Sequence, residues 1–173
     1  MNYRKSVLFV ATISLLTIPV IADHRDGPER DFRANLRGRN EVPLTLSAAR
    51  GTLDLEVNEV DTLVHFVLHY EGLQTAVGAA HIHVGQTNAN GSVTVFFCGG
   101  GGRPACPASP ATIEGDFSAN DVIGIVSQQL EASNLDKLLA AIRAGKTYAN
   151  VHTTTSPAGE IRGQIEAHRK DHD

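Results

Sequence analysis

The sequence has no surplus of basic residues. It contains 15 Lys and Arg against 19 Asp and Glu, with a formal net charge of −4. The charges are scattered along the chain, and no basic cluster occurs in the interior of the sequence. Because nucleic-acid binding needs a clustered basic surface that neutralises phosphates, the composition excludes that class of protein.

Cysteine and methionine are also scarce. Cys98 and Cys106 are the only cysteines, and Met1 is the only methionine. Two close cysteines in an oxidising compartment form a disulfide, and the four glycines between them leave the backbone free to close the ring. We predict a Cys98–Cys106 bridge. The alternative is a thiolate pair that binds a metal, but no second cysteine pair and no histidine nearby in sequence support it.

Motifs of nucleophilic catalysis are absent as well. The sequence contains no Gly-x-Ser-x-Gly elbow. Asp54 and Glu160 are single carboxylates on separate expected strands, not a catalytic pair. We therefore expect no hydrolase of the serine type.

The N-terminus carries the pattern of a secretory signal peptide. An uncharged apolar run, 6–22, follows Arg4 and Lys5 and ends with Val20 and Ala22 at the positions that a signal peptidase reads. The alternative is an uncleaved membrane anchor, but the run is short for a span of ~20 residues and a charged segment follows it. We predict cleavage after Ala22, periplasmic or secreted localisation, and no membrane anchor after processing.

The mature chain divides into three parts. Residues 23–39 are charged and poor in large apolar residues, so we expect a flexible N-terminal arm there; residues 40–167 form the domain, and residues 168–173 a solvated tail. The signal peptide holds two of the 15 basic residues, so 13 remain against 19 acidic ones, a net charge of −6. One domain of this length can bury a substantial core.

Alternating apolar and polar residues predict strands over most of the domain. In 51–57, Leu53, Leu55 and Val57 alternate with polar residues, and 62–70 follows after a turn, so the two segments form a hairpin. Further strands are expected over 79–84, 92–97, 111–117, 147–153 and 160–166.

Residues 133–145 carry the one helical pattern. Apolar residues recur at helical spacing between a capping residue, Ser133 or Asn134, and a terminating Gly145. Short strands, Gly/Pro/Asn turns and one helix predict an all-β fold, a Greek-key β-sandwich or barrel with one short helix.

Three of the eight histidines stand out by position. His81 and His83 are two apart on an expected strand, so both point to one face with Cα atoms ~6–7 Å apart, while Ile82 points to the core. Imidazoles at that separation can bind one metal ion at ~2.0–2.1 Å each. His152 lies on another expected strand, on the face opposite Val151. The alternative is that all three simply face water or make hydrogen bonds at strand ends.

The sequence resembles the chordin-type (CHRD) domain from about Leu36 to Ile165. The resemblance is carried by the stretches RGRNEVPLTLSAARGTLDL, AAHIHVGQTNANGSV, SANDVIG and LLAAIRAGKTYANVHTTTSPAGEIRGQI. It implies a β-sandwich and this order of motifs. Because the activity of that family is poorly defined, the resemblance does not imply a reaction.

A second resemblance is to the copper half of Cu,Zn superoxide dismutase. It consists of a His-x-His pair, a glycine-rich loop with a cysteine, a later Val-His and a late Gly-x-x-Arg. It implies that His81, His83 and His152 match copper ligands and that Arg162 matches the arginine guiding the anionic substrate. No histidine lies between His83 and His152, so the bridging ligand and the zinc half-site are missing.

Three imidazoles suit copper or zinc, and copper(II) binds the same nitrogen ligands more tightly, so we expect copper rather than zinc. A blue-copper site is excluded because methionine and free thiolate are lacking. We expect an exported copper-binding protein that acts as a carrier, a buffer, or a partner of a copper enzyme or another exported protein. The alternatives are a copper-only enzyme similar to superoxide dismutase and a metal-free extracellular interaction module.

The remaining histidines have weaker claims. His65 and His69 are ~13 Å apart on one strand face, so they cannot share an ion, although either could add a fourth ligand. His24, near the expected mature N-terminus, would contribute weak extra copper binding. His168 and His172 are expected in solvent. Since the ligands must be neutral, we expect copper binding to weaken as the pH falls through ~6.5, the ordinary pKa of histidine.

Overall fold

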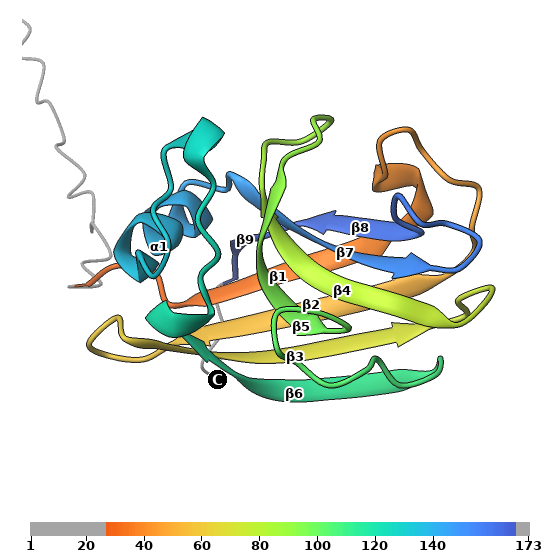
Figure 1. Ribbon diagram of the computed structural model, residues 1–173, viewed down its shortest axis with the longest axis horizontal. Helices are drawn as coiled ribbons and strands as arrows, with labels where there is room; N and C mark the ends of the chain where they lie inside the picture. Colours follow the sequence, from red (N-terminus) through yellow and green to blue (C-terminus); the bar gives the residue numbers. More distant parts are fainter. Residues whose placement is uncertain (1–26, 169–173) are drawn as a thin grey trace, which may run out of the picture.

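The computed structural model describes residues 27–168, which form the elements labelled in Figure 1. The strands are β1 (Asp31–Arg37), β2 (Arg50–Val57), β3 (Leu63–Glu71), β4 (Val77–Val84), β5 (Ser92–Cys98), β6 (Ala111–Ser118), β7 (Thr147–Thr153), β8 (Ile161–Gln164) and β9 (Glu166–Ala167). The helices are α1 (Leu135–Arg143) and the 3-10 turns η1 (Gly38–Asn40), η2 (Ala119–Asp121) and η3 (Val126–Gln128).

The strands form one antiparallel sheet that is nearly closed. Their order is β5-β4-β7-β8-β1-β2-β3-β6, and the short β9 pairs with β1. The end strands β5 and β6 approach each other, so the sheet wraps around a single core (Figure 1). Neighbours such as β4 and β7 are far apart in sequence. The predicted all-β fold with one short helix is confirmed.

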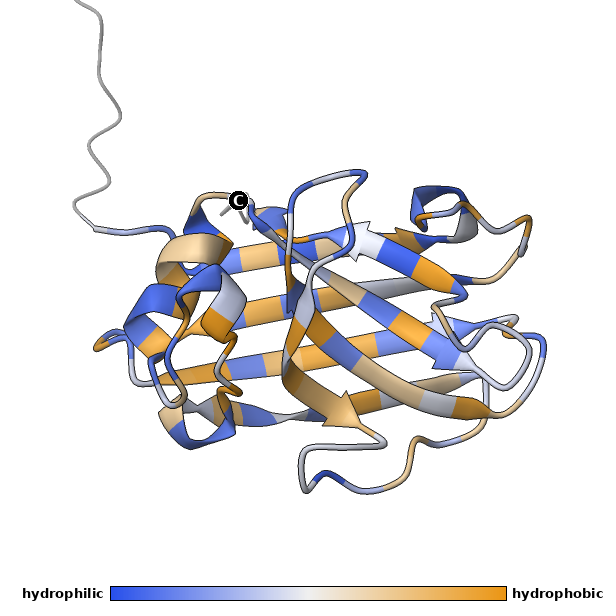
Figure 2. Ribbon diagram, turned by 45° about the horizontal axis from the view of Figure 1, so that its top comes forward, coloured by the Kyte–Doolittle hydropathy of each residue, from blue (hydrophilic) through white to orange (hydrophobic). Residues whose placement is uncertain are grey.

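Strand alternation builds the core. In β2, Leu53, Leu55 and Val57 are at most 3% exposed, and in β3 the paired face carries Val64 and Phe66, at most 1% exposed. The register places Leu55 opposite Phe66, which confirms the predicted hairpin. Figure 2 shows the alternation as orange and blue bands along the strands. Each large apolar side chain buried in this way contributes roughly 1.5–3 kcal/mol.

Helix α1 packs against one end of the sheet (Figure 1). Asn134 caps it, because its side-chain oxygen accepts a hydrogen bond of 3.0 Å from the Lys137 backbone N–H. Gly145, with φ of +64°, ends it in a conformation that glycine adopts without strain. The apolar stripe of α1 faces the core, as its spacing predicted, and consists of Leu135, Leu138, Leu139 and Ile142.

The predicted disulfide between Cys98 and Cys106 is present. It joins the end of β5 to the segment that leads into β6, and therefore fixes the connection between the two end strands. Gly99, Gly101 and Gly102 in this loop have φ of +73°, +58° and +79°, so the glycines serve the turn itself. A disulfide of this kind is typical of an oxidising compartment.

The predicted flexible arm over 23–39 is wrong in the part that the structure describes. Residues 31–37 form β1, which pairs with β2 along its whole length and also with β8. Phe32, Ala34 and Leu36 are at most 1% exposed. Arg33 and Asn35 between them are exposed, and the density of charged residues in this segment concealed a normal alternating strand.

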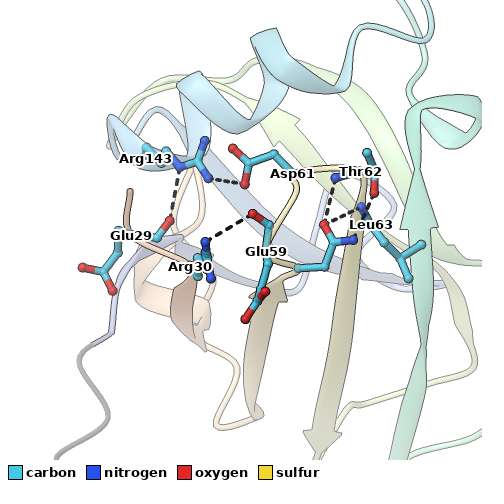
Figure 3. Close-up of polar contacts among 8 residues, drawn as sticks. Glu29, Arg30, Glu59, Asp61, Thr62, Leu63 and Arg143 are labelled. Atoms are coloured by element: carbon cyan, nitrogen blue, oxygen red, sulfur yellow. Dashed lines mark hydrogen bonds and ion pairs between the residues drawn. The ribbon is translucent and has the colours of Figure 1, made fainter. Parts of the chain in front are cut away.

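Residues preceding β1 are also held in place (Figure 3). Arg143 of α1 donates hydrogen bonds to the Glu29 carbonyl at 3.2 Å and to the Asp61 carboxylate at 2.8 Å. Arg30 donates to the Glu59 carbonyl at 3.2 Å. The domain therefore includes Glu29 and Arg30 and does not start at residue 40.

Several predictions fall wholly or partly outside the described residues. The signal peptide (1–22), residues 23–26 and the tail from 169 to 173 belong to this group and stay predictions. Within 27–168, no helix has the length and apolar character needed to cross a membrane. The strand predicted over 160–166 is divided into β8 and β9.

Candidate metal centre

Strand β4 presents His81 and His83 on the outer face of the sheet. Ile82 between them is fully buried in the core, so the alternation expected from the sequence is present. The two histidines are nonetheless covered, with only 6% and 8% of their surface exposed. They lie on a strand that has a neighbour on each side, β5 and β7.

Strand β7 brings His152 to the same place. The register puts Ala79 opposite His152 and His81 opposite Asn150, so His152 lies diagonally next to His81. The ring centroids of His81 and His152 are 4.5 Å apart, and those of His81 and His83 are 4.6 Å apart. One ring nitrogen from each of the three histidines lies within 4.8 Å of the others. The structure thus brings together the three residues that the sequence singled out.

Two of these rings present a buried nitrogen without a hydrogen-bond partner, Nδ1 of His81 and Nε2 of His152. Backbone carbonyls fix the tautomers of His152 and His83. His152 donates from Nδ1 to the Pro157 carbonyl at 3.0 Å, and His83 donates from Nδ1 to the Gly91 carbonyl at 2.9 Å. Because a carbonyl only accepts, Nε2 of both rings keeps a lone pair in the neutral form. Metal-binding histidines are commonly oriented by such backbone carbonyls.

Burial keeps the three imidazoles neutral. It lowers the pKa of His81 to about 3, helped by the neighbouring His83 and His152. Burial is likewise the main reason that the pKa of His83 falls to about 4. The pKa of His152 is lowered by burial too, against a raising effect of its bond to Pro157. Neutral imidazole is the form that binds a metal, so the rings require no deprotonation at pH 7.

The cluster fits a single ion of the copper or zinc type. With metal–nitrogen bonds of ~2.0–2.1 Å, the ligand atoms of one ion lie ~3–4 Å apart. The present separations of up to 4.8 Å would close by a small rotation of the side chains. Such an ion would also give a partner to the unpaired ring nitrogens of His81 and His152, whose burial without a partner is costly.

Aromatic rings and an arginine pack around the histidines. The rings of His83 and Tyr148 are stacked, 4.6 Å apart and only 5° from parallel, and Phe96 contacts His81 edge-on at 5.0 Å. The Arg162 guanidinium lies 3.3 Å from the Tyr148 ring centroid. Rings held on both sides by packing have little freedom to leave the site.

Arg162 does not face open solvent. It is 2% exposed, and its guanidinium donates to the carbonyls of Gln86 and Ala89 at 3.1 and 2.8 Å and to Asn90 Oδ1 at 3.4 Å. Its donors are used to fix the loop between β4 and β5. This position gives no support to the role of an anion guide that the dismutase resemblance implied.

Asn150 and Glu41 also belong to this site, although no motif in the sequence indicated them. Asn150 is 3% exposed, and its Oδ1 lies 3.0 Å from Nε2 of His83. Glu41, 6% exposed, has a pKa raised to about 7, chiefly by burial and against the opposing charge of Arg162. Asn150 could have been found, because alternation along β7 puts it on the same face as His152. Glu41 belongs to the long β1–β2 connection, whose path no local pattern indicates.

The other described histidines lie elsewhere. On β3, His65 faces Asp116 at 2.9 Å and His69 faces Thr112 at 3.1 Å. These two are surface residues paired across to β6, and neither belongs to the cluster of ring nitrogens. His168 is half-buried and its backbone N–H bonds to the Asp31 carbonyl. His24 and His172 lie outside the described residues.

Comparison with known proteins agrees with the motifs of the sequence. A family model described as the CHRD domain matches residues 32–165, which extend from β1 to the end of β8 and include His81, His83 and His152. No curated protein and no solved structure matches the chain. The presence of a CHRD domain suggests that the protein is an extracellular interaction module. With most of its length covered, this chain belongs to the CHRD domain family.

Proposed function

We propose that this protein is an exported copper-binding protein with a mononuclear centre formed by His81, His83 and His152. The observation that carries the proposal is the pair of buried ring nitrogens without a hydrogen-bond partner, on His81 and His152, within a cluster of three neutral imidazoles. Copper is preferred over zinc because the same nitrogen ligands bind copper(II) more tightly. Bound copper would supply an ion that can be exchanged or change its oxidation state.

The surroundings favour a carrier, buffer or partner of a copper enzyme. His152 is only half-buried, and the turn that follows it is exposed at Thr154, Thr155 and Pro157. An ion could therefore enter and leave from this side, while His81 and His83 stay covered. The buried guanidinium of Arg162 gives no reason to prefer a dismutase. Superoxide-dismutating activity of the copper-loaded protein would reverse that preference.

Calorimetric titration with copper(II) tests the proposal. His24→Ala should be present in every sample, so that the N-terminus does not contribute. We expect one copper ion per chain in this parent and none bound at comparable affinity after His81→Ala, His83→Ala and His152→Ala are combined. The matched control is His65→Ala with His69→Ala, which removes two histidines from β3 and should leave the titration unchanged. Equal binding by the triple variant would contradict the site.

A metal-free extracellular interaction module is the second candidate. Membership of the CHRD family favours it. So does the β1–β2 connection, where Leu44 and Leu46 are 61% and 96% exposed, as a protein-contacting loop would be. In that case the parent would bind no metal in the titration above, and Leu46→Asp would weaken association with a protein partner.

A further inference from the structure

Asn150 lies at the centre of the polar layer on the outer face. It stands opposite His81 on β4 and opposite Arg162 on β8. On its own strand it lies between Tyr148 and His152, which point to the same side. A side-chain amide with 3% exposure in this place needs partners for its oxygen and its nitrogen.

The contact between Asn150 and His83 places two acceptors face to face. His83 carries its hydrogen on Nδ1, where it is donated to the Gly91 carbonyl. Nε2 of the neutral ring therefore has a lone pair, and Asn150 Oδ1 lies 3.0 Å from it. Two lone pairs at this distance repel each other unless a positive centre lies near both.

Turning the amide over does not remove the conflict. The Asn150 amide nitrogen lies beside the nearly buried Glu41 carboxylate and lowers its pKa, against the larger raising effect of burial. With the amide reversed, Oδ1 would face that carboxylate. Gly159 makes the approach possible, since a Cβ there would collide with Glu41 Oε1 and come within 2.9 Å of Asn150 Nδ2. Glu41 therefore orients the amide so that its oxygen faces the histidines.

We propose that Asn150 Oδ1 is the fourth ligand of the ion held by His81, His83 and His152, and that Glu41 keeps the amide in that orientation. The inference rests on the proposed function. Neighbouring ligands of a four-coordinate tetragonal ion, with bonds of ~2.0–2.1 Å, are ~2.9–3.0 Å apart, which is the separation of Oδ1 and Nε2. Three nitrogens and one oxygen in such an arrangement are a set that copper(II) accepts.

The test is electron paramagnetic resonance of the copper(II) protein in ordinary water and in water enriched in ¹⁷O. In the parent, Asn150 fills the fourth equatorial position, so ¹⁷O-water should not broaden the equatorial signal. After Asn150→Ala a water molecule should take that position. Broadening should then appear, with copper affinity about tenfold lower or more, as for other losses around a metal site.

Two further variants control for misfolding and for non-specific effects of substitution. Asn150→Asp keeps an oxygen in nearly the same shape, so it should show no ¹⁷O broadening, and its added negative charge should lower the reduction potential of the copper. Asn120→Ala, an exposed amide on η2, should behave as the parent. Equatorial ¹⁷O broadening already present in the parent, and unchanged by Asn150→Ala, would overturn the fourth-ligand inference while leaving the three-histidine site intact. A parent that binds no copper would overturn both.

Discussion

Two sets of strand histidines in this molecule have opposite environments. On β3, His65 and His69 lie on the outer face beside the end strand β6 and pair with Asp116 and Thr112. On β4, His81 and His83 also lie on the outer face, yet they are almost completely buried. The difference comes from what covers the two faces. The β1–β2 and β4–β5 connections and Phe96 close over β4 and β7, whereas nearly half of the His65 side chain remains exposed.

The comparison shows what turns a strand histidine into a candidate ligand. Both sets lie on the outer face of the sheet, so this position alone does not make a histidine a metal ligand. The β4 set has a third imidazole at 4.5 Å, tautomers fixed by backbone carbonyls, and lone pairs without a partner. The β3 histidines have a carboxylate or hydroxyl partner instead. We expect metal affinity to follow these features rather than the number of histidines.

Loss of a single ligand should have the largest effect. We expect His81→Ala, His83→Ala or His152→Ala to lower copper(II) affinity by about 100-fold or more, because a lost ligand should cost at least as much as a lost supporting contact, roughly 10–100-fold. Competition with a chromophoric chelator measures this. His69→Ala should change the affinity less than twofold. Comparable losses at β3 and β4 would remove the distinction between the two regions.

Two histidines placed two residues apart on β3 should not create a metal site comparable to the one on β4 and β7. Val67→His, combined with His69→Gln, gives β3 two histidines two residues apart, as on β4, but without a third imidazole or carbonyls that fix the tautomers. In a chain lacking the three ligands, we expect this change to restore less than about one hundredth of the parent affinity. The same competition assay applies. Full restoration would mean that spacing alone suffices.

Metal-free stability should fall in acid because of the β4 histidines. The unfolded chain takes up protons near the ordinary pKa of ~6.5, whereas folded His81 and His83 do so only at about 3 and 4. Between these values the unfolded state binds more protons, so the free energy of unfolding decreases as the pH falls below ~6.5. Glu41 acts in the opposite direction between its ordinary 4.5 and its folded value of about 7, but it is one group against two.

Urea unfolding at pH 7, 6 and 5 with a chelator present tests this dependence. His81→Gln should remove about 1 kcal/mol per pH unit from the slope, since each pKa unit corresponds to ~1.4 kcal/mol. Asn120→Gln, a change at an exposed residue that does not titrate, should leave the slope as it is. An unchanged slope in His81→Gln would show that the histidine is not held neutral by the fold.

The exposed pair of His65 and Asp116 should have the smallest effect, and this effect is on the free energy of unfolding. His65 and Asp116 are 44% and 53% exposed, and exposed pairs contribute little. We expect His65→Gln to change the free energy of unfolding at pH 7 by less than about 0.5 kcal/mol, as measured by the urea midpoint. A loss of several kcal/mol would show that β3 and β6 depend on this contact.

Local patterns in the sequence predicted most of the fold. Alternation located β2 to β7, and the cap and apolar spacing located α1. The prediction was wrong for β1, because the charged residues Asp31, Arg33 and Arg37 alternate with its three core residues and make the segment look solvated. Strand order could not be obtained from any local pattern, since β4 and β7 are joined only by long-range pairing.

The candidate site was predictable in its ligands but not in its environment. The His-x-His spacing and the face of His152 follow from the two-residue period of a strand. The burial of the rings depends on loops that cross the outer face, and this burial is what lowers the histidine pKa values. The expectation that copper binding weakens near pH 6.5 therefore needs revision. Proton competition for His81 and His83 should begin well below that pH.

The metal content of the protein isolated from its native compartment tests the central claim most directly. Mass spectrometry of the elements should find about one copper per chain in the parent, with zinc well below that level. The chain with His81→Ala, His83→Ala and His152→Ala, isolated in the same way and shown to be folded, should contain neither metal above background. A parent free of copper, or a triple variant that retains it, would contradict the account.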